Sequence, residues 1–195
     1  IINEIKIILD KLSDRKVLFG NIIWTEYLPN WHPWEDFKTS YASSKSLYGG
    51  CFFTMCHPFD YVNYLFKDSE FEMVHLSKGR LNIEVNQSAR LKCNSKSIFY
   101  DLDIFVDFDS KINRHNIFLE GKDWTLNADL FKNEISFISG SENFKRNFGK
   151  INRNSLFKSL HIEFQKWLMG DGSFRSKLSD NLNLIEFMSK YNKNN

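Results

Sequence analysis

Apolar and polar residues alternate with different periods along the chain and divide it into a helical start, a strand-rich middle and a helical end. Apolar residues recur every three or four positions over residues 1–13, which predicts an amphipathic helix. Residues 17–27 are rich in β-branched and aromatic side chains, which favours a strand. Because strand residues alternate between two faces, Ile22, Trp24 and Glu26 should share one face of that strand.

Two helical segments follow the first strand. Proline suits the first turn of a helix, so Pro33 predicts a helix that runs to about Ser44. Residues 51–66 also have helical spacing, but Pro58 interrupts them. Proline removes an amide donor and clashes with the preceding turn, so the helix should break or restart at His57. The imidazole would then project from a helix break.

The middle of the chain predicts an antiparallel sheet, because short strand patterns alternate with polar breaks. These patterns cover residues 71–77, 80–85, 89–93, 97–108, 115–121, 123–131 and 134–140. The last third returns to helical spacing, with one apolar stripe that core packing would explain and a final helix that would begin near Ser179. The stripe contains Leu156, Leu160, Phe164, Trp167 and Leu168, and the final helix would turn Leu182, Ile185 and Met188 to the core.

Composition narrows the class of protein. The chain has 195 residues, 42% of them hydrophobic, and no internal repeat or linker, so we expect one domain over residues 1–195. Its net charge of +2 is spread evenly, which argues against nucleic-acid and membrane partners. Three cysteines without a CxxC pair indicate a reducing compartment. We found neither a signal peptide nor a spanning apolar run, and therefore expect a soluble, cytoplasmic protein.

The unusual residues gather between Tyr27 and Tyr61. All three prolines, two of the five tryptophans, two of the five histidines and the Gly-Gly pair lie in this segment. Such a mixture is typical of a pocket that holds a polar ligand. P-loop, GxSxG, HExxH and GxGxxG motifs are absent from the sequence. His32, His57 and Asp60, with aromatic residues beside them, favour proton transfer on a polyol such as a sugar.

Simpler interpretations of these residues stay open. His57 could bond a backbone carbonyl at the helix break, Asp60 could cap the second helical segment, and His32 could order its loop. Together the three could bind zinc, although their spacing matches no zinc motif, and a metal-dependent hydrolase would follow. His75, His115 and His161 lie in strand or helix patterns and are interpreted as structural.

Four carboxylates are predicted to share one face of a strand near the centre of the sequence. They are Asp101, Asp103, Asp107 and Asp109. A calcium site is one interpretation, but an extended strand lacks the turn glycine of a calcium-binding loop. A solvated sheet face or a subunit contact is the other.

Three segments carry a resemblance to a known family: YLPNWHPWEDF (27–37), LYGG (47–50) and TMCHPFDY (54–61). They resemble the C-terminal domain of the glucose-fructose oxidoreductase, inositol dehydrogenase and MocA family (Gfo/Idh/MocA), in a branch found with surface-sugar and polysaccharide biosynthesis. The likeness is specific over residues 17–66 and looser over the rest of the chain. It implies an α+β fold, with an open, mainly antiparallel sheet and helices packed on one face.

The resemblance also implies a function and roles for residues. The chain would be the substrate-binding and oligomerisation half of an oxidoreductase that moves a hydride between NAD or NADP and a sugar or sugar-nucleotide hydroxyl. The cofactor would be bound mainly by an N-terminal Rossmann domain, which residues 1–15 would follow as a continuing helix. This chain alone is then not expected to turn over substrate. A homo-oligomer through the open sheet face is expected as well. The alternative is a non-catalytic carbohydrate-binding or oligomerisation module without a cofactor domain.

Within the family pattern, His57 matches the catalytic histidine that acts as acid and base on the substrate hydroxyl. Tyr27, Trp31, His32, Thr54 and Asp60 are the candidate substrate-binding residues. Many members carry an aspartate four residues before the histidine, but this chain has Phe53 there, with Thr54 aligned after one deletion. Threonine can form a hydrogen bond but cannot act as a carboxylate base. Tyr48 also replaces the first glycine of the usual three-glycine turn.

Overall fold

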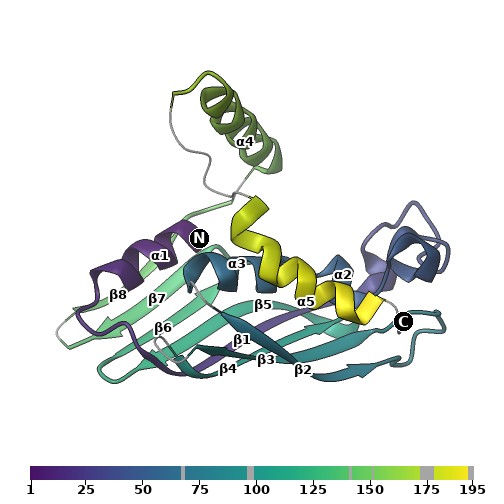
Figure 1. The fold of residues 1–195 in the computed structure, drawn as a ribbon, viewed down its shortest axis with the longest axis horizontal. Coiled ribbons are helices and arrows are strands. Elements are labelled where there is room, and N and C mark those ends of the chain that lie inside the picture. Colours follow the sequence, from purple (N-terminus) through teal and green to yellow (C-terminus); the bar gives the residue numbers. More distant parts are fainter. Residues whose placement is uncertain (67–68, 96–98, 141, 151, 172–177, 193–195) are drawn as a thin grey trace.

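One open sheet organises the protein (Figure 1). The computed structural model describes residues 1–66, 69–95, 99–140, 142–150, 152–171 and 178–192. The sheet has eight strands in the order β2-β3-β4-β1-β5-β6-β7-β8. The strands are β1 (Val17–Tyr27), β2 (Glu70–Ser77), β3 (Ser88–Ser95), β4 (Phe99–Asp107), β5 (Asp109–Gly121), β6 (Trp124–Asp129), β7 (Glu134–Ser139) and β8 (Glu142–Asn147).

Strand β1 lies at the centre of the sheet, parallel to β4 and antiparallel to β5, whereas the other neighbouring strands are antiparallel. The chain passes from β4 to β5 across the end of β1, where the carbonyl of Phe108 accepts the Leu28 N–H at 2.8 Å. Two strands that follow each other in the sequence, β4 and β5, therefore flank β1 on its two sides. This arrangement fixes which side chains of β4 and β5 stand beside Trp24.

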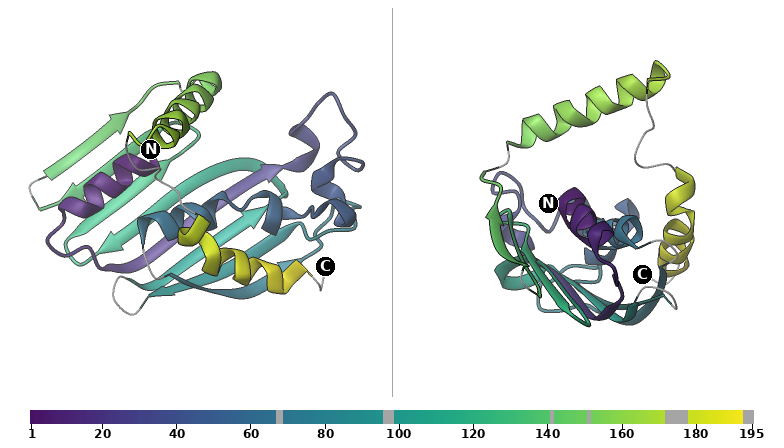
Figure 2. Two further views of the ribbon diagram at one scale, coloured as in Figure 1. Left: turned by 45° about the horizontal axis from the view of Figure 1, so that its top comes forward. Right: turned by 90° about the vertical axis from the view of Figure 1, so that its left-hand side faces the viewer.

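The helices lie on one face of the sheet (Figure 2). They are α1 (Ile2–Lys11), α2 (Cys51–Thr54), α3 (His57–Leu65), α4 (Arg153–Leu168) and α5 (Leu182–Asn192). Fully buried Phe52 and Phe59 on α2 and α3 belong to the same core cluster as Ile22 and Leu119 of the sheet. Burial of each such phenylalanine contributes about 2–3 kcal/mol. The fold class expected from the sequence is confirmed.

Two expected elements are absent and one was missed. Residues 28–50 form three 3-10 turns (Leu28–Asn30, Tyr41–Ser43 and Lys45–Leu47), so the helix predicted from Pro33 is wrong. Residues 80–85 are not a strand, because the side chain of Gln87 takes the place of a strand partner. Its Oε1 accepts the Leu81 N–H at 2.7 Å and its amide donates to the Leu81 carbonyl. Strand β8 was not predicted, since its sequence is mostly polar.

Helix α4 stands away from the sheet and from the other helices (Figures 1 and 2). The predicted helix is confirmed, and Asn152 caps it by accepting the Asn154 N–H at 2.9 Å. The expected packing of its apolar stripe against the core is wrong, because no residue of α4 is buried. The periodic spacing specifies an amphipathic helix but not what covers its apolar side. In α5, Leu184 and Phe187 face the core, whereas Leu182 and Ile185 are half exposed.

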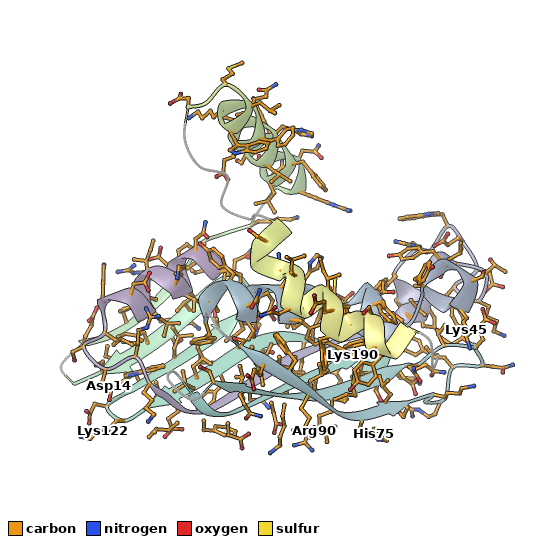
Figure 3. The ribbon with its side chains drawn as sticks, in the orientation of Figure 1. Asp14, Lys45, His75, Arg90, Lys122 and Lys190 are labelled. Atoms are coloured by element: carbon orange, nitrogen blue, oxygen red, sulfur yellow. The ribbon has the colours of Figure 1, made fainter. Side chains whose placement is uncertain are left out.

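The face of the sheet opposite the helices carries ion pairs between side chains of neighbouring strands. His75 and Arg90 project from it (Figure 3). Of the carboxylates predicted to share one face of a strand, Asp103 accepts from Arg90 at 2.8 Å and Asp101 lies 3.5 Å from the ammonium of Lys92. Asp107 accepts the backbone N–H of Asp109 at 3.2 Å. Asp109 turns elsewhere, because it binds Arg80 at 2.9 Å. These pairs give the carboxylates partners within the sheet.

No group of three or more His, Cys, Asp or Glu side chains among the described residues could hold a metal ion. No helix in the described part of the chain is long and apolar enough to cross a membrane.

Candidate functional site

The helix break predicted at His57 is confirmed and places the imidazole at the surface. Helix α2 ends at Thr54 and α3 starts at His57, with Pro58 in its first turn. Pro58 and Phe59 are buried in the core, whereas His57 is exposed. The proline ends one helix and begins the next because it can occupy a first turn but not a helix interior. The result is a rigid helix start with a solvent-facing histidine.

The ring of Trp24 contacts His57 directly. The indole stacks on the His57 imidazole with ring centroids 5.6 Å apart and an interplanar angle of 19°. It also stacks on His115, at 4.6 Å and 2°. Trp24 and His115 are direct cross-strand partners in the β1–β5 register, which explains their close parallel stacking. The indole Nε1–H donates to the carboxylate of Glu26 at 2.6 Å.

His115 is held by two further side chains. The hydroxyl of Tyr61 and the Nε2 of His115 share a hydrogen bond of 3.2 Å, and Phe131 contacts the imidazole edge-on at 5.7 Å. Tyr61 lies one helical turn after His57 on α3. Helix α3 is therefore attached to β1 and β5 through both His57 and Tyr61. We call Trp24, Glu26, His57, Tyr61 and His115 the Trp24 cluster.

Burial sets the charge of this cluster. Burial, and then the neighbouring His57, lower the pKa of His115 to about 4, against a smaller opposing effect of Asp129. His115 is thus neutral at pH 7. Burial raises the pKa of Glu26, and the hydrogen bond from Trp24 opposes that shift. Burial also raises the pKa of Tyr61, so its hydroxyl stays protonated.

Asp60 and Thr54 lie on the two helices that flank the break. Asp60 is exposed in the first turn of α3, where the positive end of the helix dipole stabilises a carboxylate. The hydroxyl oxygen of Thr54 is buried and has no hydrogen-bond partner among the described residues.

The loop after β1 holds the other predicted site residues. Trp31 packs edge-on against Phe108 at 5.1 Å, and Tyr27 pairs with Asp109 at the end of β1. His32 stacks on the exposed Trp34 at 5.0 Å. Trp31 and His32 also contact each other, with ring centroids 6.5 Å apart. No hydrogen bond, ion pair or ring contact between described residues links Tyr27, Trp31 or His32 to His57.

The glycine turn before α2 is tight. Tyr48 has φ 57°, in the left-handed region that the usual glycine of the family would adopt more easily. A Cβ on Gly49 would come within 2.5 Å of the Tyr41 carbonyl oxygen. The two segments of the backbone therefore lie closer together here than a residue with a Cβ would allow. Gly50 and Cys51 then donate to the carbonyls of Ala42 and Asn86 at 2.8 and 3.0 Å. These bonds fix where α2 starts, and hence where the helix break lies.

Sequence reasoning missed Trp24, Glu26 and His115 as parts of the site. The strand pattern did place Trp24 and Glu26 on one face of β1. Nothing local indicates that residue 115, 91 positions later than residue 24, pairs beside it in the sheet. The interpretation of His115 as a structural histidine therefore overlooked its contact with the site.

Comparisons with known proteins agree on the fold. No family model matches the chain, and no curated protein matches its sequence. Solved structures do match. An oxidoreductase from Agrobacterium radiobacter in complex with NAD+, L-tartaric acid and magnesium superposes with a TM-score of 0.77 at 10% identity, over 96% of this chain and 57% of its own. Levoglucosan dehydrogenase in complex with NADH superposes with a TM-score of 0.73 at 12% identity, over 96% and 59%.

A third neighbour is the dehydrogenase MviM from Clostridium difficile, with a TM-score of 0.66 at 10% identity over 100% of this chain and 58% of its own. These neighbours are Gfo/Idh/MocA-type oxidoreductases, so the resemblance predicted from the sequence is confirmed at the level of the fold. The chain has the fold of their C-terminal domain. It spans between 55% and 60% of the length of the neighbouring chains.

Proposed function

We propose that this chain is the substrate-binding half of an NAD(P)-dependent oxidoreductase that acts on a hydroxyl group of a sugar or sugar nucleotide. The observation that carries the proposal is the exposed imidazole of His57, presented at a helix break and stacked on Trp24. Support for the reaction class comes from neighbours of the same fold that were solved with NADH or NAD+. Support for a sugar-like substrate comes from the levoglucosan dehydrogenase structure with levoglucosan.

The residues of this chain do not fit a dinucleotide site. The sequence holds no GxGxxG turn after a strand, and Gly49 and Gly50 lie in a turn where carbonyl oxygens approach closely. We therefore assign NAD or NADP to a separate nucleotide-binding domain, as the resemblance implies.

The chain's own contribution would be proton transfer and binding. An imidazole nitrogen can accept a proton and donate it back, so His57 can take a proton from a substrate hydroxyl and return it in the reverse direction. Among the described residues the His57 ring has no hydrogen-bond partner, which leaves its nitrogens accessible to a ligand. Asp60, Thr54, Tyr27, Trp31 and His32 remain proposed pocket residues.

We also propose that copies of the chain associate through the open face of the sheet. Phe19 of β1 and Ile138 of β7 alternate with the core-facing residues of their strands and are 44% and 53% exposed, although they are apolar. Contact with a second copy of the chain would bury these side chains.

A turnover assay with one substitution tests the function. We would express the full-length polypeptide with its upstream sequence and follow NAD(P)H absorbance with a panel of sugars and nucleotide sugars. We expect His57→Ala to lower kcat by about 10²–10⁴-fold, the usual contribution of a general acid–base. The matched control is His75→Ala, an exposed histidine on the opposite side of the sheet (Figure 3). Turnover by His57→Ala equal to the wild type would contradict the role of His57.

The upstream coding sequence separates the enzyme from the non-catalytic module. A strand–GxGxxG–helix unit there supports the oxidoreductase. A stop codon followed by a start methionine near Ile1 supports a carbohydrate-binding or oligomerisation module.

A further inference from the structure

We infer that Trp24 is a positioning residue for His57, whose imidazole it orients through ring stacking. The inference rests on the proposed function, because it concerns the same histidine. Trp24 lies within residues 17–66, over which the likeness to the family is specific, but outside the three motif segments 27–37, 47–50 and 54–61. Its contacts with the site are visible only in the fold.

The indole of Trp24 is itself fixed. Its backbone pairs with Val106 of β4 and with His115 of β5, so it belongs to a central strand with a neighbour on each side. Its Nε1–H is tied to Glu26 at 2.6 Å, and its face is stacked on His115 at 4.6 Å. A ring held by its backbone, its polar edge and one neighbouring ring has little freedom to turn.

Helix α3 is docked on the same two strands at two points. His57 rests on Trp24, and Tyr61 binds His115 one turn later. Because His115 is neutral at pH 7, no buried positive charge repels His57 from the stack. The four side chains therefore fix both the position of the helix start and the plane of the His57 ring.

The His57 ring needs such a support. It is exposed at the first residue of α3, and no described residue forms a hydrogen bond with it. Many catalytic histidines are oriented by a carboxylate, but the position expected for it is occupied by Phe53 or Thr54. Stacking on Trp24 is the contact of the described structure that can orient the ring instead.

A loss of orientation should appear in kcat rather than in KM. Misplacement of a catalytic group by about 1 Å can lower a rate by about 10²-fold. We therefore expect Trp24→Leu to lower kcat of the full-length enzyme by about 10–100-fold, with KM changed by less than about threefold. Trp24→Phe keeps an aromatic face and should restore kcat to within about fivefold of the wild type.

The matched control is Trp34→Leu. Trp34 is also stacked on a histidine, His32, at 5.0 Å and 21°, but it is 79% exposed and lies outside the Trp24 cluster. Because His32 is a proposed pocket residue, this control is evaluated on kcat alone, which we expect the variant to keep. A fall in kcat as large as that of Trp24→Leu would overturn the inference, because the effect would then not depend on His57.

A second measurement does not require turnover. The motion of the His57 ring would be measured by NMR relaxation in the full-length polypeptide with isotope-labelled histidine. We expect Trp24→Leu to increase ring motion, and Trp24→Phe and Trp34→Leu to leave it unchanged. If Trp24→Leu only lowers the melting temperature, while the folded protein keeps both kcat and the order of the His57 ring, the inference is wrong. If the wild type turns over no sugar, the proposed function fails and the NMR result alone decides the positioning role.

Discussion

Lowering the pH from 7 to 5 should destabilise the protein through His115. In the unfolded chain this histidine has an ordinary pKa of 6.5, whereas in the folded protein its pKa is about 4. Burial and the nearby His57 are the causes, and Asp129 on β6 opposes them. Because the folded pKa is the lower one, the unfolded state binds the proton first as the pH falls below about 6.5. Stability is thus complete above the unfolded pKa and is lost between about pH 6.5 and 4.

The size of the effect follows from the two pKa values. A difference from 6.5 to about 4 corresponds to about 3 kcal/mol when the pH lies below both values. At pH 5 the linkage gives about 2 kcal/mol, because folded His115 is still largely neutral there. Relative to a typical stability of about 5–15 kcal/mol, this loss is large.

Urea denaturation at pH 7, 6 and 5 measures the loss. His115→Phe keeps a flat ring beside Trp24 but cannot titrate. We expect the free energy of unfolding of the wild type to fall by about 2 kcal/mol more than that of His115→Phe between pH 7 and 5. Glu26 contributes with the opposite sign, because its pKa is raised, but it is present in both proteins and cancels in the comparison.

The control for this comparison is His75→Phe, at an exposed strand position. It should keep the pH dependence of the wild type. Equal pH dependence in the wild type and His115→Phe would refute the argument, because it would mean that His115 binds a proton equally well in the folded state.

Two further predictions concern packing and assembly. Phe59→Ala should cost about 3–5 kcal/mol in urea denaturation because the ring is fully buried, whereas Phe157→Ala on α4, at 51% exposure, should cost less than about 1 kcal/mol; equal costs would show that α4 packs on the core. Ile138→Lys on the open sheet face should lower the mass measured by light scattering, whereas Ile185→Lys, at a similar 48% exposure on α5, should not; a monomeric wild type would contradict the proposed assembly.

Local signals in the sequence predicted the elements that carry the site. The β-branched and aromatic run specified β1, and Pro58 specified the start of α3 at His57. Both signals act within a few residues, because strand preference and the missing proline amide are local properties. The resemblance then indicated His57 as the candidate catalytic residue and implied the open sheet, since its motifs cover the same segments.

Long-range contacts were not predictable in this way. The stacking of Trp24 on His115 depends on which strands become neighbours in the sheet. Strand β5 lies beside β1 because the chain crosses the end of β1 at Phe108, between β4 and β5. The side chain of Gln87 likewise replaced a strand partner and turned residues 80–85 into a loop. The predicted helix after Pro33 failed for another reason: proline permits a first helical turn but does not supply the core contacts that continue one.

Because Trp24 is distant from His57 in the sequence, a comparison of such chains at the histidine motif alone does not include it. A chain that kept TMCHPFDY but replaced Trp24 with an aliphatic residue would keep the family motif and lose the ring on which His57 stacks. Conversely, a substitution at residue 115 would leave the motif intact and change the face against which Trp24 is held. The orientation of the His57 ring therefore depends on two positions in the central strands as well as on the helix that carries it. Activity should follow the Trp24 cluster more closely than it follows the motif.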